Sequence, residues 1–361
     1  MADTITFLVY LLLLLFSVGL LKRFTVNKNK MLIFLSLTLM IVVAGLRYNT
    51  GRDYENYKFL YEEAPTFVES IAIDMEVGYS ALVDILNSND LKVWSFFTIC
   101  AFLTYALLFY SFNNYHQLLY LGIFFYITYG FYFYSFNGVR QAVAMSFLAV
   151  GAKYIVEKKI VKYIIVIVLG GLMHKSLFVF LPFYFFIDKI KLDVKIWYVL
   201  FFISLILHFI PITDLFDLSF FTNLISDSEV DYSGYAENLN DDEGQSGQLS
   251  LGYLTRVVIG FFILYFYKRI TNLDKDYIVY YNFALIGILL YNAFSHVLFM
   301  SRINYYFLFF SIFALSFIIA YLNKSRKQLT INIIMAFFVA LYCYGIFIGE
   351  NGVSPYQFIS F

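Results

Sequence analysis

The chain has 361 residues, of which 61% are hydrophobic, 22% aromatic and only 14% charged. A soluble domain usually carries about 25% charged residues, and the mean hydropathy here is +0.74. Apolar runs recur along the whole length, which excludes a soluble enzyme and an extended disordered protein. The 25 basic residues balance the 25 acidic ones, so the net charge gives no indication of a nucleic-acid partner. The composition therefore predicts an all-α polytopic membrane protein.

A helix needs about 20 apolar residues to cross a bilayer, or fewer when its flanking residues reach toward the headgroups. On this criterion residues 1–361 form a single transmembrane domain. Twelve spans are predicted, at residues 4–21, 31–46, 93–111, 118–135, 138–156, 160–174, 175–189, 196–211, 251–268, 277–299, 303–322 and 330–348. The two short segments at 160–189 fit a re-entrant pair equally well, and this alternative leaves the topology unchanged.

Basic residues orient these spans, because loops on the cytoplasmic side carry an excess of Lys and Arg. Five basic clusters each follow an odd-numbered span when the N-terminus is placed outside; they begin at Lys22, Lys158, Lys189, Lys268 and Lys324. The predicted topology therefore has both ends of the chain outside.

Two long segments then lie outside. Residues 47–92 mix polar and aromatic residues around an apolar run, which predicts an external loop with an amphipathic helix at the membrane interface. Residues 212–250 contain nine acidic residues and no Lys or Arg, which predicts a solvated acidic external loop. A substrate lid is the alternative for this second segment.

Arginine is distributed against the general charge bias. Five of the eight arginines fall outside on this topology: Arg47, Arg52, Arg140, Arg256 and Arg302. The planar guanidinium grips phosphate or carboxylate with two parallel hydrogen bonds, so outward arginines at span ends predict a site for a membrane-bound anion. Arg47 and Arg256 fit the alternative of reaching toward lipid headgroups equally well.

Two further positions favour chemistry over packing. Asn137 is expected to cap a helix that has Arg140 in its first turn, where free N–H groups already attract anions. We therefore expect a pyrophosphate beside Arg140. His174 interrupts two short apolar segments, where a neutral imidazole would act as a general base or donate to a phosphate. Buried single histidines are, however, often structural.

Motifs for nucleotides and metals are weak or missing. The sequence has no Walker A segment and no Rossmann glycine pattern in a suitable context. Asp274-Lys275-Asp276 spells a DxD triplet, but it falls in a short basic loop predicted to be cytoplasmic. We therefore predict neither a metal site nor a cofactor.

The same residues carry a family resemblance. The segment Gly51-Arg-Asp53-Tyr54-Glu-Asn-Tyr57, preceded by Arg47, resembles the GxDYxxY motif of the EpsG-like polysaccharide polymerases. Further segments follow in the family's order: Glu76-Val-Gly78-Tyr79, Asn137-Gly-Val-Arg140-Gln141, His174-Lys175-Ser176, Ser301-Arg302 and Pro355-Tyr356. Val77 stands where the family usually has proline.

The resemblance implies a Wzy-type polymerase with a GT-C-like glycosyltransferase architecture. Such an enzyme joins undecaprenyl-pyrophosphate-linked oligosaccharide repeat units into O-antigen, capsule or exopolysaccharide at the outer leaflet of the bacterial inner membrane. Its partners would be that lipid-linked oligosaccharide, membrane lipids and a candidate co-polymerase that regulates chain length. An O-antigen ligase and a lipid-linked oligosaccharide flippase remain as alternatives.

Roles for the candidate residues follow from this reaction. Arg140 would stabilise the leaving pyrophosphate, and either His174 or Asp53 would act as the general base. The remaining candidates would bind pyrophosphate or sugar; they are Arg47, Arg52, Arg256, Arg302, Gln141, Glu76, Tyr54, Tyr57 and Tyr79.

Overall fold

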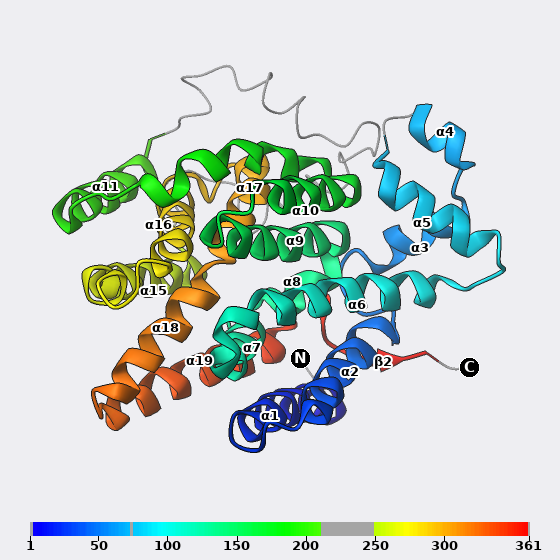
Figure 1. The fold of residues 1–361 in the computed structure, drawn as a ribbon. Helices are drawn as coiled ribbons and strands as arrows, with labels where there is room; N and C mark the ends of the chain where they lie inside the picture. The colour runs from blue at the N-terminus through cyan, green and yellow to red at the C-terminus, as the bar shows by residue number, and fades with distance from the viewer. Residues whose placement is uncertain (1–2, 73–74, 211–248, 360–361) are drawn as a thin grey trace. The chain divides into compact units, whose positions relative to one another are not determined.

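The computed structural model describes residues 3–72, 75–210 and 249–359. Almost all regular structure in these ranges is helical (Figure 1). The chain divides into two compact units, unit 1 (Met1–Phe178 and Leu315–Phe361) and unit 2 (Val179–Ala314). The predicted acidic loop at 212–250 lies almost wholly outside the described residues.

Unit 1 holds the N-terminal helices and the end of the chain. Its elements are α1 (Thr4–Asn27), α2 (Lys30–Gly45), β1 (Arg47–Tyr48), α3 (Tyr54–Glu62), α4 (Phe67–Ala72), α5 (Val77–Asn87), α6 (Val93–Ser111), η1 (Asn113–Leu118), α7 (Leu119–Thr128), α8 (Phe131–Asn137), α9 (Val139–Val156), α10 (Ile160–Met173), α19 (Gln328–Ile348), η4 (Glu350–Gly352) and β2 (Gln357–Phe358).

Unit 2 is smaller and also helical. It contains η3 (Ile187–Lys189), α11 (Val194–Leu207), α15 (Leu251–Thr271), α16 (Tyr277–Phe294) and α17 (Leu298–Leu308). The 3-10 helix η2 (Lys175–Phe185) and the helix α18 (Ser311–Lys324) each pass from one unit into the other.

The helices match the predicted apolar segments. Among the described residues, seven helices are long and apolar enough to cross a membrane. The segment Asn113–Thr128 and the helix α8 form a pair bent by 57°, which is an eighth candidate if the pair is one span. Four shorter apolar helices occupy the other predicted segments; they are α2, α10, η2 and α11. The fold is thus that of an all-α, multi-pass membrane protein, while the number of twelve spans stays a prediction.

Two expected helices take a different form. The segment expected at 175–189 forms the 3-10 helix η2, which contains Pro182; proline has no N–H for an α-helical hydrogen bond. Within the stretch 118–135, Gly130 takes a left-handed conformation with φ of 93° and separates α7 from α8. Helix α8 follows this break and ends at Asn137, and α9 begins directly after Gly138.

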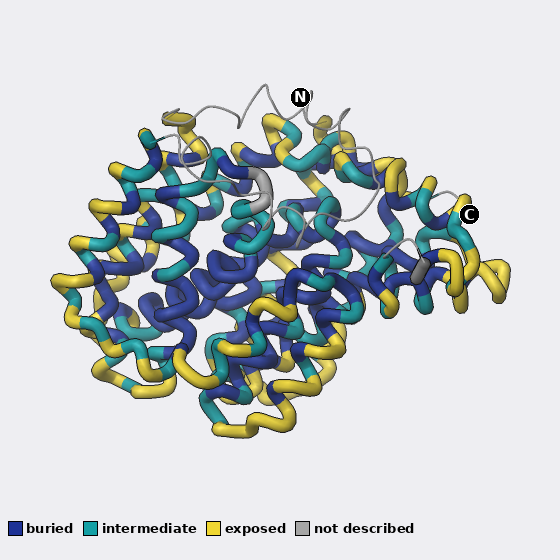
Figure 2. The backbone as a smooth tube through the Cα atoms, turned by 90° about the horizontal axis from the view of Figure 1, so that it is seen from above, coloured by how far each residue is buried: buried dark blue, intermediate teal, exposed yellow. Residues whose placement is uncertain are grey.

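Burial follows the helices of unit 1 unevenly. Of an apolar stretch of 18 residues in each helix, 83% is buried inside the protein in α9, against 33% in α1 and 28% in α19. Figure 2 shows the corresponding pattern of continuous buried stretches flanked by helices with exposed outer turns. Helix α9 is therefore a central element of unit 1, and its first turn is a well-supported place for a functional side chain.

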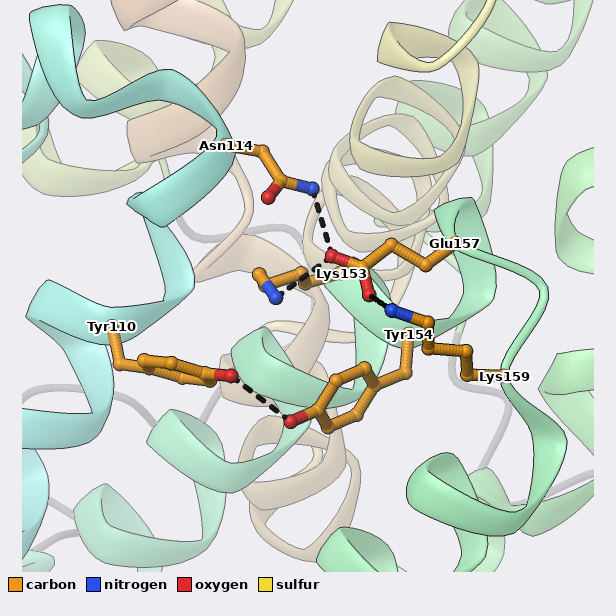
Figure 3. A network of polar contacts seen from close by, with 6 residues as sticks. All are labelled: Tyr110, Asn114, Lys153, Tyr154, Glu157 and Lys159. Carbon is orange, nitrogen blue, oxygen red and sulfur yellow. Dashed lines mark hydrogen bonds and ion pairs between the residues drawn. The ribbon is translucent and has the colours of Figure 1, made fainter.

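A polar network fixes the opposite end of α9 (Figure 3). The buried Lys153 amine lies 2.7 Å from Glu157 and packs over the ring of Tyr110 from α6, at 4.8 Å. Glu157 also accepts hydrogen bonds from Asn114 at 3.1 Å and Lys159 at 2.6 Å. The network therefore ties α9 to α6 and η1.

The end of the chain is bound to its beginning. Strands β1 and β2 pair antiparallel, with Arg47 opposite Phe358, and β2 lies beside α2 in Figure 1. The Tyr356 hydroxyl donates to the Val43 carbonyl at 2.9 Å, and the Tyr10 hydroxyl donates to the Val353 carbonyl at 2.9 Å. These bonds join the C-terminal segment to α1 and α2.

Candidate functional site

Glu76 stands immediately before α5, at its N-cap position. Two residues later, a Cβ atom on Gly78 would lie 2.8 Å from the Leu172 carbonyl oxygen in the last turn of α10. Any larger residue at this position would push the two helices apart. The glycine therefore allows α5 to approach the end of α10 closely enough for Glu76 to reach the residue that follows it.

That residue is His174. Helix α10 ends at Met173, and His174 is extended, with φ of −157° and ψ of 109°. Its Nδ1 atom lies 2.9 Å from Glu76 Oε1, and the exposed fractions of the two side chains are 7% and 2%. The other ring nitrogen, Nε2, is buried and has no hydrogen-bond partner among the described residues.

Arg140 completes this group. It lies in the first turn of α9, as the sequence predicts, and its Nη1 atom forms an ion pair with Glu76 Oε2. The guanidinium also packs over the Tyr79 ring, 4.9 Å from the ring centroid. Glu76 therefore joins a cation on one oxygen to an imidazole on the other, and the three residues are called the Glu76 triad below.

The electrostatics of the Glu76 triad favour its charged carboxylate. Burial disfavours the ionised form of Glu76, but the hydrogen bond with His174 and the charge of Arg140 outweigh burial and lower the pKa of Glu76 to about 2. An ionised carboxylate accepts the Nδ1 proton of a neutral imidazole, which leaves Nε2 with its lone pair.

Two further predicted residues, Tyr57 and Asp53, interact electrostatically with the surroundings of Arg140. Burial raises the pKa of the Tyr57 phenol to about 12, against the lowering effect of the Arg140 charge, while the charge of Asp53 adds to the increase. Tyr57 therefore lies within range of the charges of both Arg140 and Asp53. The predicted candidates Asp53, Tyr57, Glu76, Tyr79, Arg140 and His174 are thus neighbours in unit 1.

The tyrosines of this region are largely covered. Tyr54 stacks on Phe97 with ring centroids 5.1 Å apart, and Tyr79 meets Phe96 edge to face at 5.6 Å. Tyr54, Tyr57 and Tyr79 belong to one buried cluster with these two phenylalanines. In this structure their ring faces pack on protein, and the predicted role in stacking sugars stays untested.

Arg47 is enclosed by the protein. It is 2% exposed, and its guanidinium lies between the rings of Phe97 and Phe136 at 4.2 and 4.7 Å. It donates to three backbone carbonyls, those of Ala44, Thr50 and Phe136. These contacts give Arg47 a structural task in holding the loop after α2; the prediction that it binds substrate stays untested.

Asn137 does not cap α9, contrary to expectation. Gly138 takes the N-cap position, without a side-chain hydrogen bond. The Asn137 amide instead donates to the Asn351 carbonyl at 3.0 Å, while its oxygen lies 3.5 Å from the Asp53 amide. The side chain is therefore used to join the first motif to the end of the chain.

The other unit 1 candidates have simpler surroundings. Arg52 is exposed, and its amide donates to the Asn351 carbonyl at 3.2 Å. Gln141 is 5% exposed and accepts a hydrogen bond from the Tyr134 hydroxyl at 2.6 Å. Their predicted roles in binding pyrophosphate or sugar stay predictions.

Arg256 and Arg302 lie in unit 2. The Arg256 guanidinium packs over Tyr291 at 4.9 Å and over Tyr305 at 5.7 Å. Arg302 is half-buried in α17. The predicted contribution of both arginines to anion binding stays a prediction.

The central position of Glu76 was not predicted; the sequence suggested only that it binds sugar hydroxyls. The available signal was its place two positions before Gly78, since a glycine needed for close approach brings its neighbours into contact with another element. The described residues contain no group of three or more His, Cys, Asp or Glu side chains placed to hold a metal.

The fold and the Glu76 triad define a multi-pass membrane protein with a buried histidine joined to a carboxylate–arginine ion pair. Comparison with protein families identifies this class further: the EpsG family matches residues 30–358, and the chain belongs to that family. The resemblance predicted from the motifs is therefore confirmed. Comparisons with curated proteins and with solved structures found no match.

Proposed function

We propose that this protein is a Wzy-type polymerase of the bacterial inner membrane. It would join undecaprenyl-pyrophosphate-linked oligosaccharide repeat units at the outer leaflet, with the Glu76 triad facing the exterior. Membership of the EpsG family supports a polysaccharide polymerase in general. The observation that carries the finer proposal is the Glu76 triad, because it combines a held imidazole with a guanidinium.

The reaction needs one proton to be moved. A hydroxyl oxygen of one lipid-linked unit forms a bond to the anomeric carbon of the growing chain, whose bond to the pyrophosphate oxygen breaks. The His174 Nε2 atom would take the hydroxyl proton, while Glu76 holds Nδ1–H and stabilises the imidazolium that forms. This contact favours His174 over Asp53 as the general base.

The leaving group needs positive charge. The pyrophosphate leaves with the electron pair of the broken bond, and Arg140 would stabilise it as the charge develops. A guanidinium has five N–H donors, so its bond to Glu76 does not exhaust its capacity. Because a cationic side chain serves this role, we propose that the reaction needs no metal ion.

The test is polymer formation by purified protein in detergent, supplied with lipid-linked repeat units extracted from a strain that lacks the gene. Wild-type protein should produce a ladder of longer glycans in the presence of EDTA, and His174→Ala should produce none. His116→Ala is the matched control, because His116 is exposed in η1. A wild-type protein that leaves single units unchanged would overturn the proposal.

The same strain separates the alternatives. Single repeat units on the outer leaflet of the deletion strain support a polymerase. A flippase would instead leave the units facing the cytoplasm, and a ligase would leave full-length polymer on its lipid carrier. Complementation with His174→Ala at normal protein level should reproduce the deletion phenotype.

A further inference from the structure

A second polar cluster lies in unit 2, where the ends of four helices meet. On the predicted topology all four ends are on the outer side of the membrane. We call it the unit 2 cluster; its members are His208 after α11, Tyr253 and Arg256 in the first turns of α15, Tyr291, Asn292 and His296 at the end of α16, and Tyr305 in α17.

Ring faces build most of this cluster. His208 stacks on Tyr253 with centroids 4.1 Å apart and planes 16° apart, and Tyr253 stacks on Tyr291 at 5.9 Å and 25°. The His296 ring lies 5.7 Å from that of His208. The Arg256 guanidinium packs over the far end of this ladder, on Tyr291. Three helices thus present one continuous row of rings.

Polar atoms in the same place lack partners within the described residues. Asn292 is 1% exposed; its Nδ2 atom donates to Ser204 Oγ at 3.1 Å, but its Oδ1 atom accepts no hydrogen bond there. Both ring nitrogens of His296 are buried and also have no hydrogen-bond partner in the described part of the chain. Leaving such groups unmatched is unfavourable, so the cluster is suited to a ligand that supplies further hydrogen bonds.

The types of atom limit the ligand. A histidine ring in its neutral form offers one donor and one acceptor. The Asn292 Oδ1 atom can only accept. A phosphate near neutral pH has few protons to give, whereas a sugar hydroxyl both donates and accepts. The half-buried Tyr305 adds an aromatic ring of the kind that packs on a sugar ring.

We propose that the unit 2 cluster is a saccharide-binding subsite, with Asn292 and His296 hydrogen-bonded to hydroxyls of one sugar. The inference rests on the proposed function in one respect: that sugar would belong to the lipid-linked repeat unit. The residues of this subsite are distinct from the Glu76 triad, so saccharide binding here and proton transfer by His174 are separable functions.

The chain's four histidines allow a direct test on the wild-type protein. Protein labelled with ¹⁵N-histidine is titrated with the repeat-unit oligosaccharide after its lipid pyrophosphate has been removed. The ring signals of His296 and His208 should shift saturably, while the signal of the exposed His116 should not move. Histidine-to-glutamine variants assign the four signals.

A matched pair of variants gives a second readout. His296→Ala should weaken oligosaccharide binding at least about tenfold, whereas His116→Ala should leave it unchanged. His296→Gln, which keeps one donor and one acceptor, should recover part of the affinity. Absence of any His296 shift at saturating oligosaccharide would overturn the proposal. A His296 shift in a protein that forms no polymer would instead leave the subsite standing and reject the polymerase.

Discussion

Nδ1 of His174 lies 2.9 Å from Oε1 of Glu76, although 98 positions separate the two residues in the chain. With Arg140 on its other oxygen, Glu76 is both the partner of a cation and the orienting group for an imidazole. In the proposed reaction the role that follows for Glu76 is positioning: it would select which nitrogen of His174 is available for proton transfer.

Replacement of this carboxylate should therefore reduce turnover more than substrate binding. In Glu76→Gln the amide offers no charge to Arg140 or to an imidazolium, and we expect kcat to fall by about 100-fold, with KM changing little. Polymerisation rates at several concentrations of lipid-linked substrate check this split. Glu157→Gln, in the network of Figure 3, should retain near wild-type rates. An unchanged kcat in Glu76→Gln would contradict the assignment.

The low pKa of Glu76 also makes stability depend on pH. The pKa of Glu76 is about 2 in the folded protein, against an ordinary value of 4.5 in the unfolded chain. Its stabilising effect is therefore complete above about pH 4.5 and is lost as the pH falls toward 2. Between pH 5 and pH 3 this amounts to about 2 kcal/mol.

The melting temperature of detergent-solubilised protein measures this effect. Wild-type protein should lose more stability than Glu76→Gln between pH 5 and pH 3, so the gap between them narrows on acidification. Glu157, whose pKa is also lowered to about 2 by its lysine and asparagine partners against the effect of burial, is present in both proteins and cancels in the comparison. A difference in melting temperature between the two proteins that stays constant with pH would contradict the ionised state of Glu76.

Close approach of α5 to α10 should be essential. In Gly78→Ala the new methyl group meets the Leu172 carbonyl, so α5 must shift and Glu76 moves away from His174. We expect a loss of stability of about 1–3 kcal/mol and a large loss of polymerisation in the protein that remains folded. Gly19→Ala is the control, because a Cβ at Gly19 meets nothing within 4 Å. Equal activity of the two variants would refute the packing argument.

Arg47 provides a contrasting prediction. Lysine cannot reproduce a planar group that donates to three carbonyls between two aromatic rings, so Arg47→Lys should leave buried acceptors unpaired. We expect destabilisation of about 2–4 kcal/mol, measured by thermal unfolding, with the KM of the folded fraction unchanged. Arg269→Lys, at an exposed arginine of α15, should be neutral in both measurements. A raised KM with normal stability would instead indicate that Arg47 binds substrate.

Hydropathy predicted the helices well because an apolar run long enough to span a bilayer has few alternative structures. The place of Arg140 in the first turn of α9 followed from the turn residues before it. The burial of Arg47 could not be predicted in this way, since basic residues report the side of the membrane and not the depth within the protein. Nor could the link from Glu76 to His174, which depends on the packing of α5 on α10 and not on any local pattern.

The pairing of β1 with β2 has a consequence for biogenesis. The loop with Asp53 is translated early, yet its backbone is bonded to Asn351 and Gly352, about 300 positions later. During synthesis the first motif is therefore inserted without its final partners, and its closure is among the last long-range steps of assembly. This loop therefore gains its final backbone partners only in chains that have been translated as far as Gly352.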